Sequence, residues 1–130
     1  MESALEGWTR RLGEGHPNVQ RAREALGRLL YEEGKFAQAE GYFRRVLEVW
    51  ETSGGSAREM GETHFNLGCL RALQGDRAGA LDHLRRAIDR GFSDVEAFED
   101  RDLRLLRGEP ELERLLEPLR LARAKPAGGE

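Results

Sequence analysis

The chain lacks the features that mark secreted, membrane-spanning or disulfide-stabilised proteins. It has one cysteine, Cys69, in 130 residues, which excludes an intramolecular disulfide and fits a reducing compartment. No run approaches the roughly 20 apolar residues needed to cross a bilayer. The N-terminus carries acidic Glu2 and Glu6 and no apolar core, so it does not have the pattern of a secretory signal. We therefore expect a cytoplasmic protein with no membrane partner.

The chain also lacks an excess of positive charge. Its net charge is -3, so the protein as a whole has no electrostatic reason to bind nucleic acid. The length suits one domain. Hydrophobic residues make up 38% and charged residues 35%, a balance that favours thin helical hairpins surrounded by solvent over a thick globular core.

What the chain does contain is an internal repeat with a period of 41 residues. Small and large apolar positions keep their order in both copies, and the gaps within each copy are identical. A fixed period of this size is typical of stacked helical repeats. The first copy carries Leu26-Gly27, Gly34, Ala39, Phe43, Arg44-Arg45 and Leu47, and the second carries Leu67-Gly68, Gly75, Ala80, Leu84, Arg85-Arg86 and Ile88.

Each copy is predicted to form two helices with a sharp turn between them. Gly34 and Gly75 can adopt the left-handed conformation that closes a helix. In the second copy, Asp76 is a suitable N-cap because its carboxylate can accept from free amides. Small Ala39 and Ala80 would let helix axes approach closely, with the large residues one turn later filling the gap between neighbours.

We accordingly expect an all-α fold, an α-α superhelix, in one domain over residues 1–124. An N-terminal half-repeat helix precedes two full repeats, and capping helices follow them. The predicted ranges are 2–13 for the half-repeat helix, 18–51 and 57–90 for the repeats, 94–122 for the capping helices and 125–130 for a disordered tail.

The pattern resembles the tetratricopeptide repeat. That family has Leu-Gly on the first helix, Gly at the turn, then Ala, an aromatic residue and a further Ala on the second helix. Departures are Leu30 and Arg71 where the family favours Tyr, Leu84 in place of an aromatic residue, and Val46 in place of the last Ala. The family unit has about 34 residues, so 52–60 supplies an extra segment, as a longer loop or as extended helix ends. Such longer repeats resemble those of kinesin light chains and bacterial scaffold proteins.

The C-terminal region departs from the repeat. Ser93 and Glu96 have the spacing of a capping box, which predicts a helix to about residue 107. Pro110 suits the first turn of a further helix, and Pro118 is expected to shorten or kink it. Residues 102–112 resemble a motif that terminates arrays of this family, and that resemblance implies a cap over the last repeat.

The N-terminal helix is expected to cover the open flank of the first repeat with Leu5, Trp8 and Leu12. Core packing is the favoured interpretation of Trp8. The alternative is a homodimer that pairs through this open end, with Leu5 and Trp8 at the contact.

No residue pattern indicates catalysis or metal binding. The histidines His16, His64 and His83 lack metal-ligand spacing, and no base can be paired with Cys69. We expect no enzyme activity, no metal and no cofactor. A Cys69-dependent enzyme or redox protein is a remote alternative.

Function is therefore argued from shape. First helices of stacked hairpins line a concave face that can hold an extended peptide or a partner helix. Asn66 is the leading candidate, because an amide both donates to and accepts from a peptide unit and the resemblance places a ligand-binding Asn there. The basic clamp by which some family members hold chaperone tails is absent, so we expect no tight binding of such tails. The predicted groove residues are Arg21, Glu24, Arg28, Tyr31, Glu62, Phe65, Asn66, Cys69 and Leu73.

Overall fold

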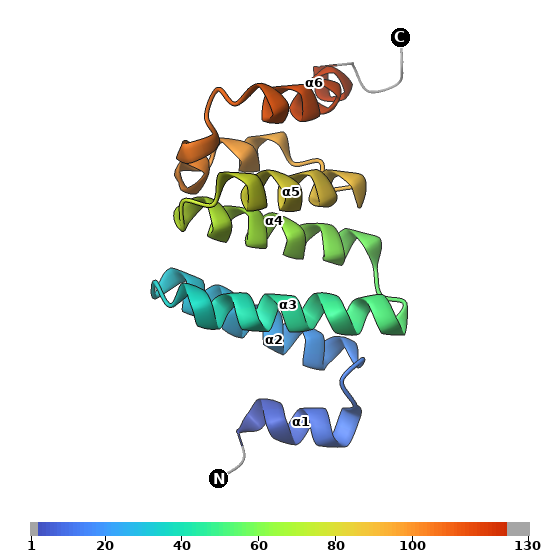
Figure 1. Ribbon diagram of the computed structural model, residues 1–130. Coiled ribbons are helices and arrows are strands. Elements are labelled where there is room, and N and C mark those ends of the chain that lie inside the picture. The colour runs from blue at the N-terminus through green and yellow to red at the C-terminus, as the bar shows by residue number, and fades with distance from the viewer. Residues whose placement is uncertain (1–2, 125–130) are drawn as a thin grey trace.

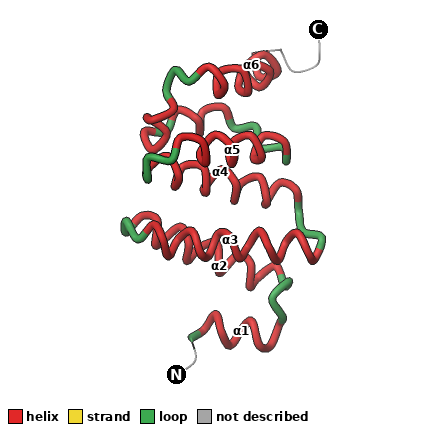
Figure 2. Tube along the Cα trace, viewed as in Figure 1, coloured by secondary structure: helices red, strands yellow, loops and turns green. Residues whose placement is uncertain are grey.

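The computed structural model describes residues 3–124, and these form a stack of helices without a strand. In Figure 1 the helices follow one another in chain order, with the first and last helices at opposite ends of the stack. Figure 2 shows that short loops connect them. The elements are α1 (Ala4–Leu12), α2 (Pro17–Glu32), α3 (Phe36–Ser53), α4 (Ala57–Leu73), α5 (Arg77–Asp89), the 3-10 helices η1 (Val95–Glu99) and η2 (Arg101–Leu106), and α6 (Pro110–Ala124).

Both hairpin turns have the predicted glycine geometry. Gly34 and Gly75 have φ values of +79° and +80°, which a residue with a side chain rarely adopts. The amide of Asp76 donates to the carbonyl of Arg71 at 2.9 Å, closing the end of α4. The Asp76 carboxylate then accepts from the amide of Gly79 at 2.9 Å and caps α5. The two hairpins, α2–α3 and α4–α5, share the turn glycine, whereas the side-chain cap is confined to the second, because Lys35 precedes α3 and its side chain does not cap it. We refer to them as the first and second repeats.

Within each repeat, a glycine on the first helix accommodates a large residue on the second. A Cβ atom on Gly27 would lie 2.8 Å from Cε1 of Phe43, and one on Gly68 would lie 2.7 Å from Cδ2 of Leu84. Both large residues are fully buried. The missing side chain lets the two helices of each repeat pack closely, as the repeat pattern predicts.

The extra residues of the long period lengthen helices and do not form a long loop. α3 continues to Ser53 and α4 begins at Ala57, so residues 54–56 alone connect the repeats. Gly54 ends α3 with a φ of +78°. Gly55 packs on the ring of Trp50, where a Cβ atom would lie 1.7 Å from a ring carbon. Of the two predicted forms of this segment, the structure has the extended helix ends.

The N-terminal helix covers the first repeat less completely than expected. Gly7 is the buried residue of α1, while Trp8 and Leu12 are 42% and 45% exposed. Because successive residues of a helix point about 100° apart, a helix that meets its neighbour at Gly7 directs Trp8 away from it. The prediction that Trp8 packs in the core is wrong.

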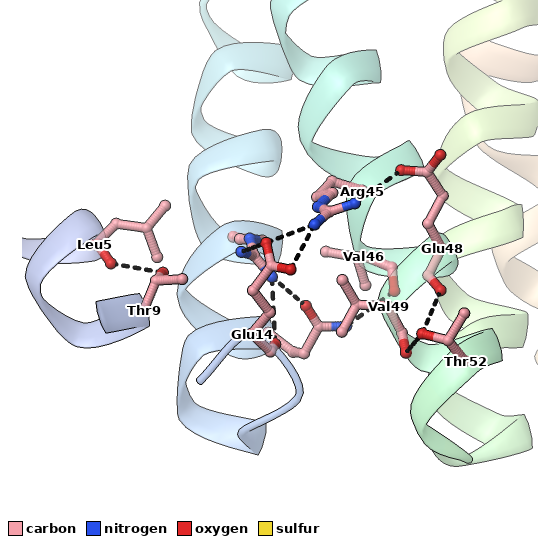
Figure 3. A network of polar contacts seen from close by, with 10 residues as sticks. Leu5, Thr9, Glu14, Arg45, Val46, Glu48, Val49 and Thr52 are labelled. Carbon is pink, nitrogen blue, oxygen red and sulfur yellow. Dashed lines mark hydrogen bonds and ion pairs between the residues drawn. The ribbon is translucent and has the colours of Figure 1, made fainter. Parts of the chain in front are cut away.

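A buried polar network fastens the segment after α1 to the first repeat. The Gln20 side chain donates to the carbonyl of Val46 at 2.8 Å, and buried Arg23 donates to the Gln20 side-chain oxygen at 2.8 Å. Arg23 also pairs with the Glu14 carboxylate at 3.2 Å, which Arg45 approaches to 2.5 Å (Figure 3). The hydrogen bond from Arg45 holds the pKa of Glu14 below its usual value.

The predicted helix after Ser93 is replaced by η1 and η2. Ser93 makes no capping box, because η1 begins after Asp94 and has no side-chain cap. Asp100, with extended backbone, separates the two segments, and its carboxylate accepts from the amide of Asp102 at 2.8 Å. In each segment the buried residues are three positions apart, and residues with that spacing lie on one face of a 3-10 helix. These residues are Val95, Phe98, Leu103 and Leu106.

The last helix begins at Pro110, as predicted, and continues through Pro118 to Ala124. The expectation that Pro118 shortens it is wrong, and an exposed proline here loses one helix hydrogen bond at the surface. The predicted tail, 125–130, lies outside the described residues, as does position 2 of the predicted first helix. None of the described helices is both long and apolar enough to cross a membrane.

Candidate binding groove

Two cavities follow the first helices of the two repeats. One, of about 470 Å³, lies between α2 and the start of α4, and the other, of about 290 Å³, lies between the ends of these helices and η2. Arg28 lines both. The two cavities therefore adjoin and form one groove along α2 and α4.

The structure brings most of the predicted groove residues to this surface. The larger cavity is lined by Arg21, Glu24, Arg28 and Glu62 of the predicted set, and the smaller by Arg28, Tyr31, Phe65, Asn66 and Cys69. Leu73 lines neither cavity, although it is exposed. Residues that the sequence did not indicate add Arg58 and Glu59 at the start of α4, and Asp100 and Asp102 from the C-terminal segment.

Glu24 lines the larger cavity and connects the two helices of the groove. Its carboxylate lies 3.1 Å from the hydroxyl of Thr63 and accepts from the side-chain amide of Asn66 at 3.3 Å. Burial raises the pKa of Glu24, and the charge of Glu62 raises it further, while the hydrogen bond from Thr63 lowers it. Asn66 is thus half-buried and fixed in orientation by Glu24.

The far end of the groove is closed by the C-terminal segment. The Tyr31 hydroxyl donates to the carboxylate of Asp102 at 2.5 Å, and burial together with this bond raises the pKa of Tyr31. Phe65 stacks on Phe92 with ring centroids 4.5 Å apart and meets Phe98 edge-on. Tyr31 and Phe65, which the sequence predicts as ligand contacts, therefore also hold the C-terminal segment against α2 and α4.

Cys69 lies in an environment that suppresses thiol reactivity. The residue is buried, and burial raises the pKa of its thiol, with Asp100 and Asp102 raising it further. A nucleophilic or redox-active thiol requires the opposite shift, toward the thiolate. The remote alternative of a Cys69-dependent enzyme has no support in this geometry.

Sequence analysis missed a close contact between two histidines of the second repeat. Nδ1 of His64 on α4 lies 3.1 Å from Nδ1 of His83 on α5. Burial lowers the pKa of His64 to about 4 and also lowers that of His83. His64 lies 11 residues before Gly75 and His83 lies 8 residues after it, so both are two to three helix turns from the hairpin turn, and antiparallel helices can bring such positions together. Among the described residues, no group of three or more His, Cys, Asp or Glu side chains could hold a metal ion.

Comparison with protein families agrees with this architecture. A family model described as tetratricopeptide repeat matches residues 1–52 and 25–90, more than half of the chain. The chain belongs to the tetratricopeptide repeat family, whose repeats generally mediate protein–protein interactions. A search of the curated proteins finds no match.

Proposed function

We propose that this protein is a non-catalytic adaptor that binds an extended segment of a partner protein in the groove along α2 and α4. The observation that carries the proposal is the continuity of the two cavities through Arg28. Together they give the inner face of both repeats a hollow long enough for a chain to lie across several helix turns. Concave faces of stacked repeats bind extended chains in this manner.

The groove offers the polar groups that an extended chain requires. Asn66 uses one N–H on Glu24, and its side-chain oxygen can accept from a peptide amide. Arg28 is exposed and can donate to a peptide carbonyl. Groups of this kind recognise the backbone, which every partner carries, and leave sequence preference to the neighbouring charges.

The test is affinity capture from the source cell with the wild-type chain and with the double variant Arg28→Ala, Asn66→Ala. We expect the variant to lose the captured partner while its melting temperature stays within a few degrees of wild type. The control is Arg114→Ala, Glu117→Ala, which removes one positive and one negative side chain from α6 outside both cavities. Undiminished capture by the groove variant would place the binding site elsewhere.

Self-association through the N-terminal end is a second candidate, favoured by apolar side chains exposed there. Trp8 and Leu12 on α1 are 42% and 45% exposed. Burying such residues against a second copy would recover about 25 cal/mol per Å² of apolar area. Sedimentation equilibrium at increasing concentration tests this, with Trp8→Ser expected to shift any dimer toward monomer. A monomer at all concentrations removes the candidate.

A further inference from the structure

The groove carries an excess of negative charge. Among the residues that line the two cavities, six are acidic and three are arginines. One arginine, Arg58, already pairs with Glu62 at 3.5 Å, and Arg21 donates to the side chain of Asn18. The acidic residues are Glu24, Glu32, Glu59, Glu62, Asp100 and Asp102.

Glu24 is distinctive because it is half-buried and its hydrogen-bond partners, Thr63 and Asn66, are both neutral. Within the part of the chain that the structure describes, no arginine or lysine forms an ion pair with this carboxylate. Burial and the charges of Glu62 and Glu59 raise the pKa of Glu24 and outweigh the charge of Arg28, one turn further along α2, which lowers it. The Glu24 carboxylate is thus partly desolvated without an ion pair, which is unfavourable. A cation arriving in the cavity would relieve this repulsion and complete the hydrogen bonding of Glu24.

We propose that the groove selects extended segments that carry lysine or arginine, with one cationic side chain seated on Glu24 between Glu59 and Glu62. This inference rests on the proposed function and specifies the class of partner. The cavity around Glu24, about 470 Å³, has room for a long side chain of this type. The adjoining cavity continues the preference, because Asp100 and Asp102 line its far side.

An acidic segment fits the same surface poorly. Arg21 and Arg28 are the groove arginines that form no ion pair in residues 3–124, so two cations would have to offset the carboxylates of both cavities. Like charges brought together in a partly desolvated site cost free energy. Charge complementarity therefore favours a basic occupant over an acidic one.

The experiment uses three N-acetylated, C-amidated octapeptides that are identical except for lysine, glutamine or glutamate at alternate positions. Each is titrated into the ¹⁵N-labelled full chain and followed by NMR. We expect the lysine peptide to bind at least tenfold more tightly than the glutamate peptide and to shift the amide signals of Glu24, Thr63 and Asn66. Its affinity should fall as salt is raised, because the groove charges are partly exposed.

The variant Glu24→Gln keeps the size of the side chain and an oxygen for Thr63 and Asn66 but removes the charge. It should weaken binding of the lysine peptide about tenfold, which corresponds to about 1.4 kcal/mol, and leave the affinity for the glutamine peptide unchanged. Glu117→Gln removes an equal charge outside both cavities and should alter neither of the two peptide affinities. The melting temperature of each variant establishes that the fold is retained.

The two proposals fail in different ways. If the glutamate or glutamine peptide binds in the groove as tightly as the lysine peptide, the inference is overturned and the adaptor function stands. If none of the three peptides binds, or if all shifts lie outside the groove, the proposed function and the inference are both overturned.

Discussion

The two repeats use the same packing device with different large residues and in different surroundings. In the first repeat Phe43 fills the space over Gly27, and in the second Leu84 fills the space over Gly68. The first repeat keeps a polar network with buried Arg23 beside it. The second has a more apolar setting, since η2 packs on α4 and contributes Leu103 and Leu106 to the same core as Leu84.

This difference shows which part of the repeat pattern determines structure. The glycine and the large residue fix how close the helices of one repeat come, and this holds for either large residue. What surrounds that contact depends on the neighbouring element. A short α1 leaves room for polar side chains next to α2, whereas the C-terminal segment encloses α4 on a further side.

The strongest test of the comparison is truncation of the large residue in each repeat. Phe43→Ala should lower the free energy of unfolding by about 4 kcal/mol and Leu84→Ala by about 3 kcal/mol, because both remove fully buried side chains and leave cavities. Urea unfolding measures both. Phe43→Leu, which gives the first repeat the residue of the second, should cost about 1 kcal/mol. A greater loss from Leu84→Ala than from Phe43→Ala would contradict the equivalence of the two contacts.

Acid should destabilise the second repeat through its histidine pair. His64 and His83 have lowered pKa values in the folded state, about 4 for His64, against about 6.5 when unfolded. The unfolded chain therefore binds more protons between these values, and the free energy of unfolding should fall by about 3 kcal/mol as the pH drops from about 6.5 to 4.

Urea unfolding at several pH values, with NMR titration of the histidine ring signals, measures this effect. His64→Asn should remove most of the pH dependence in that range. His16→Asn serves as the control because it removes a histidine outside the pair. Equal slopes for wild type and His64→Asn would show that the pair does not titrate as described.

Adding a methyl group at the two packing glycines sharpens the comparison further. Gly27→Ala and Gly68→Ala should each destabilise by about 1–2 kcal/mol, because overpacking outweighs the gain in helix propensity. Gly41→Ala, on α3 with open space around its Cβ position, should instead stabilise by about 0.5–1 kcal/mol. Thermal unfolding of the three variants under one condition is sufficient, and a stabilising Gly27→Ala would disprove close packing in the first repeat.

The smallest expected effect concerns the contact between the first repeat and the cap. Tyr31→Phe removes the hydrogen bond to Asp102 and should cost about 1 kcal/mol. Hydrogen exchange of amides in 95–106 should become faster, while Tyr42→Phe, at a tyrosine without such a bond among the described residues, should leave it unchanged. Exchange that is insensitive to Tyr31→Phe would show that aromatic packing alone holds the cap.

The sequence was sufficient for the turns and the packing contacts because residue type decides these features locally. Gly34 must allow a positive φ, and Gly27 must leave space for a ring. The network of Gln20 and Arg23 could not be predicted, because polar residues on a helix are ordinarily exposed and their burial depends on the loop at Glu14. The 3-10 segments were missed because a helical capping pattern at Ser93 competed with the spacing of apolar residues.

The groove charges show the same limit. Glu24 was predicted on the inner face, but its partners Thr63 and Asn66 come from the other repeat, and only the stacking of the two repeats fixes that pairing. Asp100 and Asp102 reach the groove because the cap folds back toward α2 and α4. Local sequence patterns carry no information on either arrangement.

The extended helix ends have a consequence for recognition. The larger cavity takes Ser56, Arg58 and Glu59 from the start of α4, which is the part of the chain that the 41-residue period adds to the common unit. A related protein with the shorter spacing would lack this wall and the carboxylate on it. Repeat length is then a variable that can change ligand preference without any substitution in the residues that define the family.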